Sequence, residues 1–70
     1  ATSINAPLGG NIFNIALAEG SSVNEEDSVI ILEAMKMETA VKTPVAGVIS
    51  KIYVNEGDKV NPGDPLFEVS

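Results

Sequence analysis

The chain has 70 residues, and residues 1–70 read as one small domain with a marginal core. Four lysines against ten acidic residues give a net charge of −6, which repels phosphate backbones, so nucleic-acid binding is not expected. Cysteine and histidine are absent, which excludes disulfides, thiolate catalysis and the commonest general base and metal ligand. No apolar run approaches the roughly 18 residues of a membrane span, and no signal peptide is recognisable, so direct membrane insertion is not expected.

The two halves of the sequence resemble each other. With a shift of 37 residues, residues 7–32 align with 44–69 without a gap, and nine of the 26 pairs are identical. This similarity predicts two copies of one motif, about residues 4–33 and 41–70, related by a pseudo-two-fold axis. Residues 33–39 would join the copies as a hairpin, and the two chain ends would meet at the opposite end of the molecule.

In chain order, each copy is predicted to contain a short strand, a longer strand, a short extended segment with one valine that faces the core, and a closing strand. Proline ends the first strand because it cannot donate to a sheet ladder, and glycine marks the bend that follows. β-Branched and aromatic residues favour strand, and no segment has a sustained helical period, so no helix longer than one turn is predicted. The predicted strands are residues 4–6, 11–17, a short segment at Val23, 29–32, 41–43, 48–54, a short segment at Val60, and 66–69.

The spacing of apolar residues predicts the shape of these strands. Within residues 11–17 and 48–54 the apolar positions step by three and then by two, which indicates a β-bulge that curves the sheet. Glu68 aligns with Ile31, so both positions are expected to face outward, with positions 30, 32, 67 and 69 facing inward. The predicted fold is therefore all-β, with two small antiparallel sheets packed as a flattened barrel.

Two corresponding turns differ in sequence. Asn61–Asp64 has proline and then glycine at its central positions, which predicts a type II turn. Asn24–Asp27 has two glutamates there, and we expect a type I turn instead. The acidic run Glu25–Asp27 lacks the spacing of a calcium-binding loop, so we interpret it as a solvated turn and predict no metal site.

The segment Glu33–Thr39 departs from the local rules that the rest of the chain follows. Tight hairpin turns favour glycine, asparagine or aspartate, and this tip has none, so Met35 and Lys36 would adopt unfavourable conformations. A lysine in a hairpin is usually a solvated charge, and methionines beside it usually pack at the edge of a core. A local rule broken at the centre of the repeat nevertheless indicates function, with Lys36 displayed for modification by another enzyme.

The segment Glu33-Ala34-Met35-Lys36-Met37-Glu38 resembles the biotinyl-lysine motif of biotin carboxyl carrier domains, whose core is Ala-Met-Lys-Met. The resemblance extends over nearly the whole chain, from Ala6-Pro7 through the Glu-Gly turns to the closing apolar strand. It implies a barrel-sandwich fold of two four-stranded antiparallel sheets with quasi-two-fold symmetry. Some carriers have an inserted "thumb" loop in the first half, but the gapless repeat has no room for one, so the thumbless type is expected.

The resemblance implies that a biotin protein ligase attaches biotin to Lys36 as an amide. The domain would then be a cytoplasmic carrier and not an enzyme. It would carry CO₂ as carboxybiotin between the biotin carboxylase and the carboxyltransferase or decarboxylase domains of a biotin-dependent enzyme. The residues expected to be read by the ligase and the other partners flank the lysine: Glu33, Ala34, Met35, Met37 and Glu38.

Other interpretations of the same segment remain open. Lipoyl domains resemble this fold, but their lysine is typically preceded by aspartate and followed by alanine, where this chain has Met35 and Met37. An unmodified structural β-barrel whose hairpin docks a partner is a further alternative. The flanking residues can also be explained without a recognition role: the methionines as packing at the edge of the core, and the glutamates as solvated charges. Glu33 and Glu38 are not expected to act as a hydrolytic acid and base, because no histidine or nucleophile accompanies them.

Overall fold

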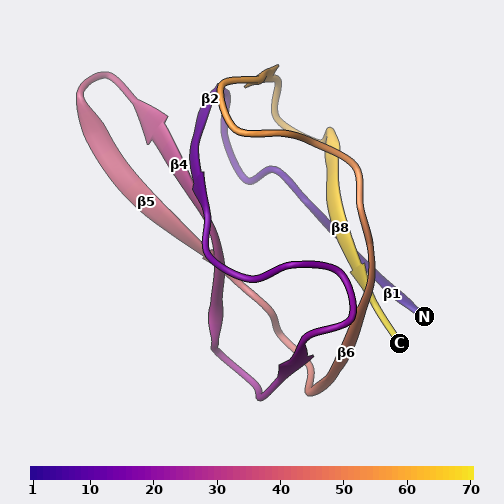
Figure 1. The fold of residues 1–70 in the computed structure, drawn as a ribbon. Coiled ribbons are helices and arrows are strands. Elements are labelled where there is room, and N and C mark those ends of the chain that lie inside the picture. The colour runs from indigo at the N-terminus through magenta and orange to yellow at the C-terminus, as the bar shows by residue number, and fades with distance from the viewer.

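Short strands rich in β-branched residues account for all the regular structure of residues 1–70 in the computed structural model (Figure 1). β1, β8, β6 and β3 form one antiparallel sheet, and β5, β4, β2 and β7 form the other. The predicted all-β fold of two four-stranded antiparallel sheets is confirmed. No helix is long and apolar enough to cross a membrane. The strands are β1 (Thr2–Asn5), β2 (Gly10–Ile15), β3 (Ser22–Val23), β4 (Ser28–Ala34), β5 (Met37–Lys42), β6 (Gly47–Ile52), β7 (Lys59–Val60) and β8 (Pro65–Val69).

One apolar core lies between the two sheets. The predicted anchors Val23 and Val60 are both 4% exposed, and positions 30, 32, 67 and 69 all face the core, as expected from the alternation. Ile31 and Glu68 are half-buried. The core consists of Ile4, Ala6, Ile12, Val23, Val29, Ile30, Leu32, Val41, Ile49, Val60, Leu66, Phe67 and Val69.

The predicted bulges are present in both long strands. The pairing of β2 with β4 skips a residue between Ile12 and Asn14, and that of β6 with β8 skips one between Ile49 and Lys51. β2 ends at Ile15, two residues before the predicted end of this strand. Residues 16–21 join β2 to β3 without any inserted loop, as residues 53–58 join β6 to β7. The chain therefore has no thumb.

A glutamate from each half binds the end of a long strand from the other half. The backbone N–H of Ile15 donates to Oε2 of Glu56 at 3.1 Å, and the N–H of Ile52 donates to Oε2 of Glu19 at 2.8 Å. Both N–H groups lie at strand ends, where they would otherwise depend on water for a partner. The two carboxylates therefore connect the halves at equivalent positions, 37 residues apart in sequence.

The expectation of a type I turn at Asn24–Asp27 is wrong. Glu26 has a φ of 70°, close to the 89° of Gly63 at the corresponding position, whereas a type I turn has negative φ at both central residues. The Glu26 N–H donates to the Thr43 carbonyl at 2.8 Å, and the Asn24 N–H donates to Oδ2 of Asp27 at 2.8 Å. These bonds hold the backbone in a conformation that the glutamate alone does not favour.

Replacing Glu19 by alanine should lower the free energy of unfolding by about 1 kcal/mol, because the Ile52 N–H loses its charged acceptor. Urea denaturation followed by circular dichroism measures this change. The matched control is Glu25→Ala, since Glu25 is exposed and its side chain makes no hydrogen bond. Equal stability of the two variants would show that the carboxylate of Glu19 adds nothing to the fold.

Candidate functional site

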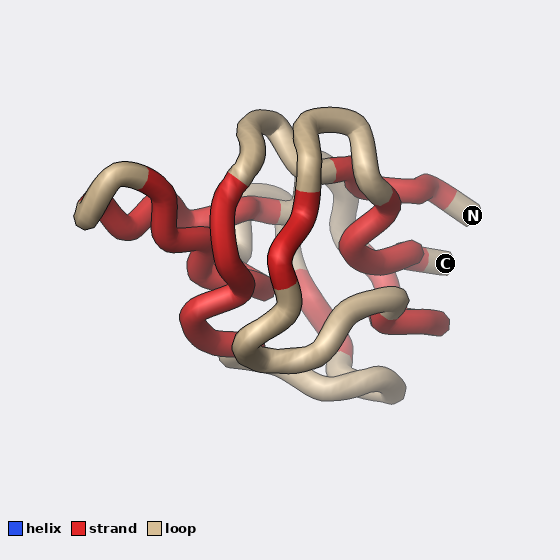
Figure 2. Tube along the Cα trace, turned by 90° about the horizontal axis from the view of Figure 1, so that it is seen from above, coloured by secondary structure: helices blue, strands red, loops and turns tan.

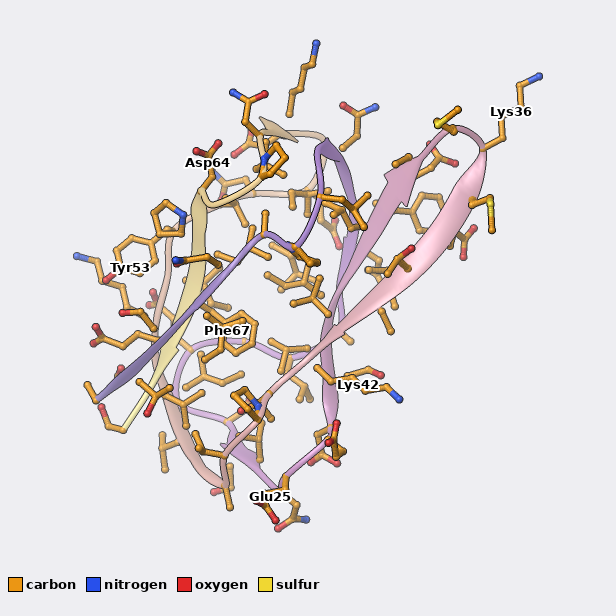
Figure 3. The ribbon with its side chains drawn as sticks, turned by 180° about the vertical axis from the view of Figure 1, so that it is seen from behind. Glu25, Lys36, Lys42, Tyr53, Asp64 and Phe67 are labelled. Carbon is orange, nitrogen blue, oxygen red and sulfur yellow. The ribbon has the colours of Figure 1, made fainter.

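The β4–β5 hairpin extends beyond the body of the domain (Figure 2). Its strands pair from Ser28 and Lys42 to Ala34 and Met37, but the pairing of β4 with β2 stops at Glu33. β5 is the edge strand of its sheet, so the tip has no neighbouring strand on that side. Lys36 lies at the tip, and its side chain points away from the body (Figure 3).

The tip is a two-residue turn in a strained conformation. Met35 has a φ of 52° and Lys36 a φ of 64°, the two positive angles that a type I′ turn requires. This turn matches the twist of the flanking strands, but each L-residue with left-handed φ costs about 1–2 kcal/mol. The unfavourable conformations predicted from the missing glycine, asparagine and aspartate are therefore present.

The expected recognition residues surround the lysine at the tip. Met35 is 95% exposed and Met37 is 71% exposed, so neither thioether belongs to the core. Glu33 pairs with Glu38 directly across the hairpin, where two like charges are destabilising. Lys36 and Glu38 are exposed, whereas Glu33 and Ala34 are half-buried. The tip thus presents one ammonium group between two thioethers, with two carboxylates at its base.

An open concavity of about 440 Å³ lies beside the base of the hairpin. The start of β2 and the β7 segment form it together with the hairpin, because β7 pairs with β2 at Gly10 and Asn11. Sequence reasoning did not identify this surface, since the pairing of β2 with β7 joins segments almost fifty residues apart. Its lining residues are Gly9, Gly10, Asn11, Glu33, Ala34, Met35, Lys36, Lys59, Val60 and Asn61. No group of three or more acidic side chains could hold a metal ion.

The match to known sequences covers the whole domain. The model of a family described as "Biotin-requiring enzyme", the biotin and lipoyl attachment domain, matches residues 2–69. The chain is 39% identical over 70 residues to a biotin carboxyl carrier protein of Streptococcus mutans, covering 100% of the chain and 54% of that protein. It is 38% identical over 66 residues to a pyruvate carboxylase of Bacillus subtilis, covering 94% of the chain and 6% of that enzyme.

Solved structures show the same fold at similar identity. The Kluyveromyces lactis urea carboxylase matches with a TM-score of 0.93 and 32% identity, over 99% of this chain and 6% of that one. A lipoyl domain of the 2-oxoglutarate dehydrogenase complex of Azotobacter vinelandii matches with a TM-score of 0.84 and 28% identity, over 100% of this chain and 96% of that one.

The chain therefore belongs to the biotin and lipoyl attachment family, and its relatives place it among the biotin carboxyl carrier domains. Such domains carry the transferred group and do not catalyse its transfer. The chain spans about half the length of the streptococcal relative and a small fraction of the carboxylases, in which similar domains are one part of a larger enzyme.

Replacing Met35 by glycine should raise the free energy of unfolding by about 0.5–1 kcal/mol, because glycine adopts positive φ without strain but loses more backbone entropy. Thermal denaturation measures the change. The control is Met37→Gly in β5, where φ is not positive and glycine should lower stability by about 0.5–1 kcal/mol. Stabilisation by neither or by both substitutions would contradict a strained turn at Met35.

Proposed function

We propose that residues 1–70 form a thumbless biotin carboxyl carrier domain in which Lys36 carries covalent biotin. In this proposal, repeats of about residues 4–33 and 41–70 form the scaffold, and the 33–39 hairpin displays the lysine. The observation that carries the proposal is the place of Lys36 at the apex of a strained two-residue turn, within the segment Ala-Met-Lys-Met. The similarity to a streptococcal biotin carboxyl carrier protein supports the same assignment.

The attachment reaction explains what the turn provides. A biotin protein ligase presents biotin as its adenylate, the lysine nitrogen attacks the acyl carbon, an amide bond forms, and AMP leaves with loss of a proton from nitrogen. The attacking amine must be neutral and unhindered, so the ligase supplies the deprotonation and the hairpin supplies access. Glu33, Ala34, Met35, Met37 and Glu38 are the residues that the ligase and later partners would read.

The exposed methionines suit a recognition surface. Thioether side chains are flexible and polarisable, so Met35 and Met37 can adapt to the different surfaces of a ligase and a carboxylase. A structural role alone would place them against the core, and they do not lie there. Their exposure therefore favours recognition over packing.

The biotinylated domain would act as a tethered carrier in the cytoplasm. Carboxybiotin on Lys36 would move between a biotin carboxylase and a carboxyltransferase or decarboxylase, and the tether would keep its local concentration high at both sites. The relatives named pyruvate carboxylase and urea carboxylase support a parent enzyme of this kind.

A lipoyl-type carrier is the second candidate function. The match to the lipoyl domain of Azotobacter vinelandii over 96% of that chain supports this candidate, because a lipoyl domain has the same fold. The two methionines beside Lys36 favour biotin, because lipoyl domains typically have aspartate and alanine at those places.

Co-expression with a biotin ligase and biotin should add one biotin per chain, located by peptide mapping on the peptide that contains Lys36. Lys36→Arg should remove the adduct without changing the thermal midpoint, because arginine keeps its charge and cannot be acylated in this way. Lys42→Arg, in the exposed part of the same hairpin stem, is the matched control and should be modified normally.

Each other outcome has a definite meaning. Biotin on Lys36→Arg would show that the assigned lysine is wrong. A folded wild-type chain that takes no biotin but accepts lipoate from a lipoate ligase would favour the second candidate. If a folded chain accepts neither biotin nor lipoate, the remaining candidate is an unmodified structural β-barrel whose hairpin docks a partner.

A further inference from the structure

Gly10 is in contact with the base of the hairpin, at a point where no side chain fits. A Cβ atom added to Gly10 would collide with the carbonyl oxygen of Glu33 and would lie 3.1 Å from its carbonyl carbon. It would also lie 3.2 Å from the Cβ of Ala34. The Glu33 atoms are backbone atoms, so the strain could be relieved only by moving β2 or the hairpin itself.

This contact is the last support that the body gives to the tip. The pairing of β2 with β4 ends at Asn11 and Glu33, and Ala34 to Met37 continue without a partner outside the hairpin. A shift of the β4 backbone at Glu33 would therefore be transmitted to the turn, because no strand outside the hairpin pairs with residues beyond Glu33.

We propose that Gly10 is a positioning residue for the modification of Lys36, because its missing side chain lets β2 hold the hairpin base at Glu33 and Ala34. This inference rests on the proposed function, since it concerns the same lysine. Ligation requires the amine to meet an acyl carbon that the ligase holds in place, and a misplacement of about 1 Å can cost on the order of 100-fold in rate. Gly10 has no side chain that could take part in the reaction, so its role is to position the hairpin.

The repeat supplies a matched control at the other end of the molecule. A Cβ atom on Gly47 would collide with the carbonyl oxygen of Ser70 and would lie 2.9 Å from Cγ1 of Val69. Val69 and Ser70 lie by the chain ends, away from the Lys36 hairpin (Figure 1). Gly47→Ala therefore imposes a similar collision without disturbing the hairpin.

A second control separates positioning from a blocked surface. Gly9 lines the same concavity as Gly10, but a Cβ there would lie 3.4 Å from Cδ of Pro62 and 3.5 Å from the Val60 carbonyl oxygen. These are ordinary contacts, so Gly9→Ala should leave the hairpin in place. It adds a methyl group to the concavity beside the lysine.

The test is the initial rate of biotinylation by a purified biotin ligase with biotin and ATP, measured against the concentration of each folded domain. Gly10→Ala should lower kcat/KM at least about tenfold, with kcat carrying most of the loss. Gly47→Ala and Gly9→Ala should stay within about twofold of the wild-type value. Amide resonances of Met35–Met37 should shift in Gly10→Ala and not in Gly47→Ala.

A variant that fails to fold still leaves the inference testable. Trimethylamine N-oxide favours the folded state and can be added to every sample alike. Ala34→Val approaches the same contact from the hairpin side, so the amide resonances of Lys36 and Met37 should shift in this variant as they do in Gly10→Ala.

The results separate this inference from the proposed function. An unmodified wild-type domain would overturn the proposed function itself. A biotinylated wild type, with Gly10→Ala modified as fast as Gly47→Ala, would overturn only the positioning role. Equal loss in Gly9→Ala and Gly10→Ala would also overturn it, because the ligase would then be reading the concavity.

Discussion

The reciprocal hydrogen bonding between the two halves is the constraint on which the rest of the structure depends. The Ile12 N–H donates to the Asp58 carbonyl at 2.7 Å, and the Ile49 N–H donates to the Ser21 carbonyl at 2.9 Å. Ile12 in turn accepts from the Gly57 N–H at 2.7 Å. Each sheet therefore contains strands from both halves, so neither half can complete a sheet alone. This exchange allows a chain of 70 residues to enclose a core.

The stability of the paired sheets allows the domain to tolerate the strained tip. Two residues with left-handed φ cost about 1–2 kcal/mol each, a large share of the roughly 5–15 kcal/mol that stabilises a small domain. The strain persists because the stem is paired without interruption from Ile30–Val41 to Ala34–Met37, which holds the turn in this conformation. A glycine-rich turn would relieve this strain. It would also remove the side chains of Met35 and Lys36, which are now exposed at the tip.

Most of the fold was predictable because its signals are local. The bulges, the inward anchors at Val23 and Val60, and the strained tip all follow from spacing and residue type within a few positions. The positive φ at Glu26 was not predictable, since a bond to Thr43 imposes it. The contact at Gly10 was missed for the same reason. Glycine there looked like a bend, and only the tertiary pairing shows that it makes room for the hairpin.

The termini also lie side by side, since Thr2 pairs with Val69. By the 37-residue offset, Ser70 corresponds to Glu33 and Ala1 to Glu38, so four residues would join these two positions as Ala34–Met37 join Glu33 to Glu38. A bridge of the sequence Ala-Met-Lys-Met from Ser70 to Ala1 would restore that spacing and create a second tip at the opposite pole. Such a circularised domain could be reopened elsewhere, and it would display two lysines at opposite ends of a single barrel.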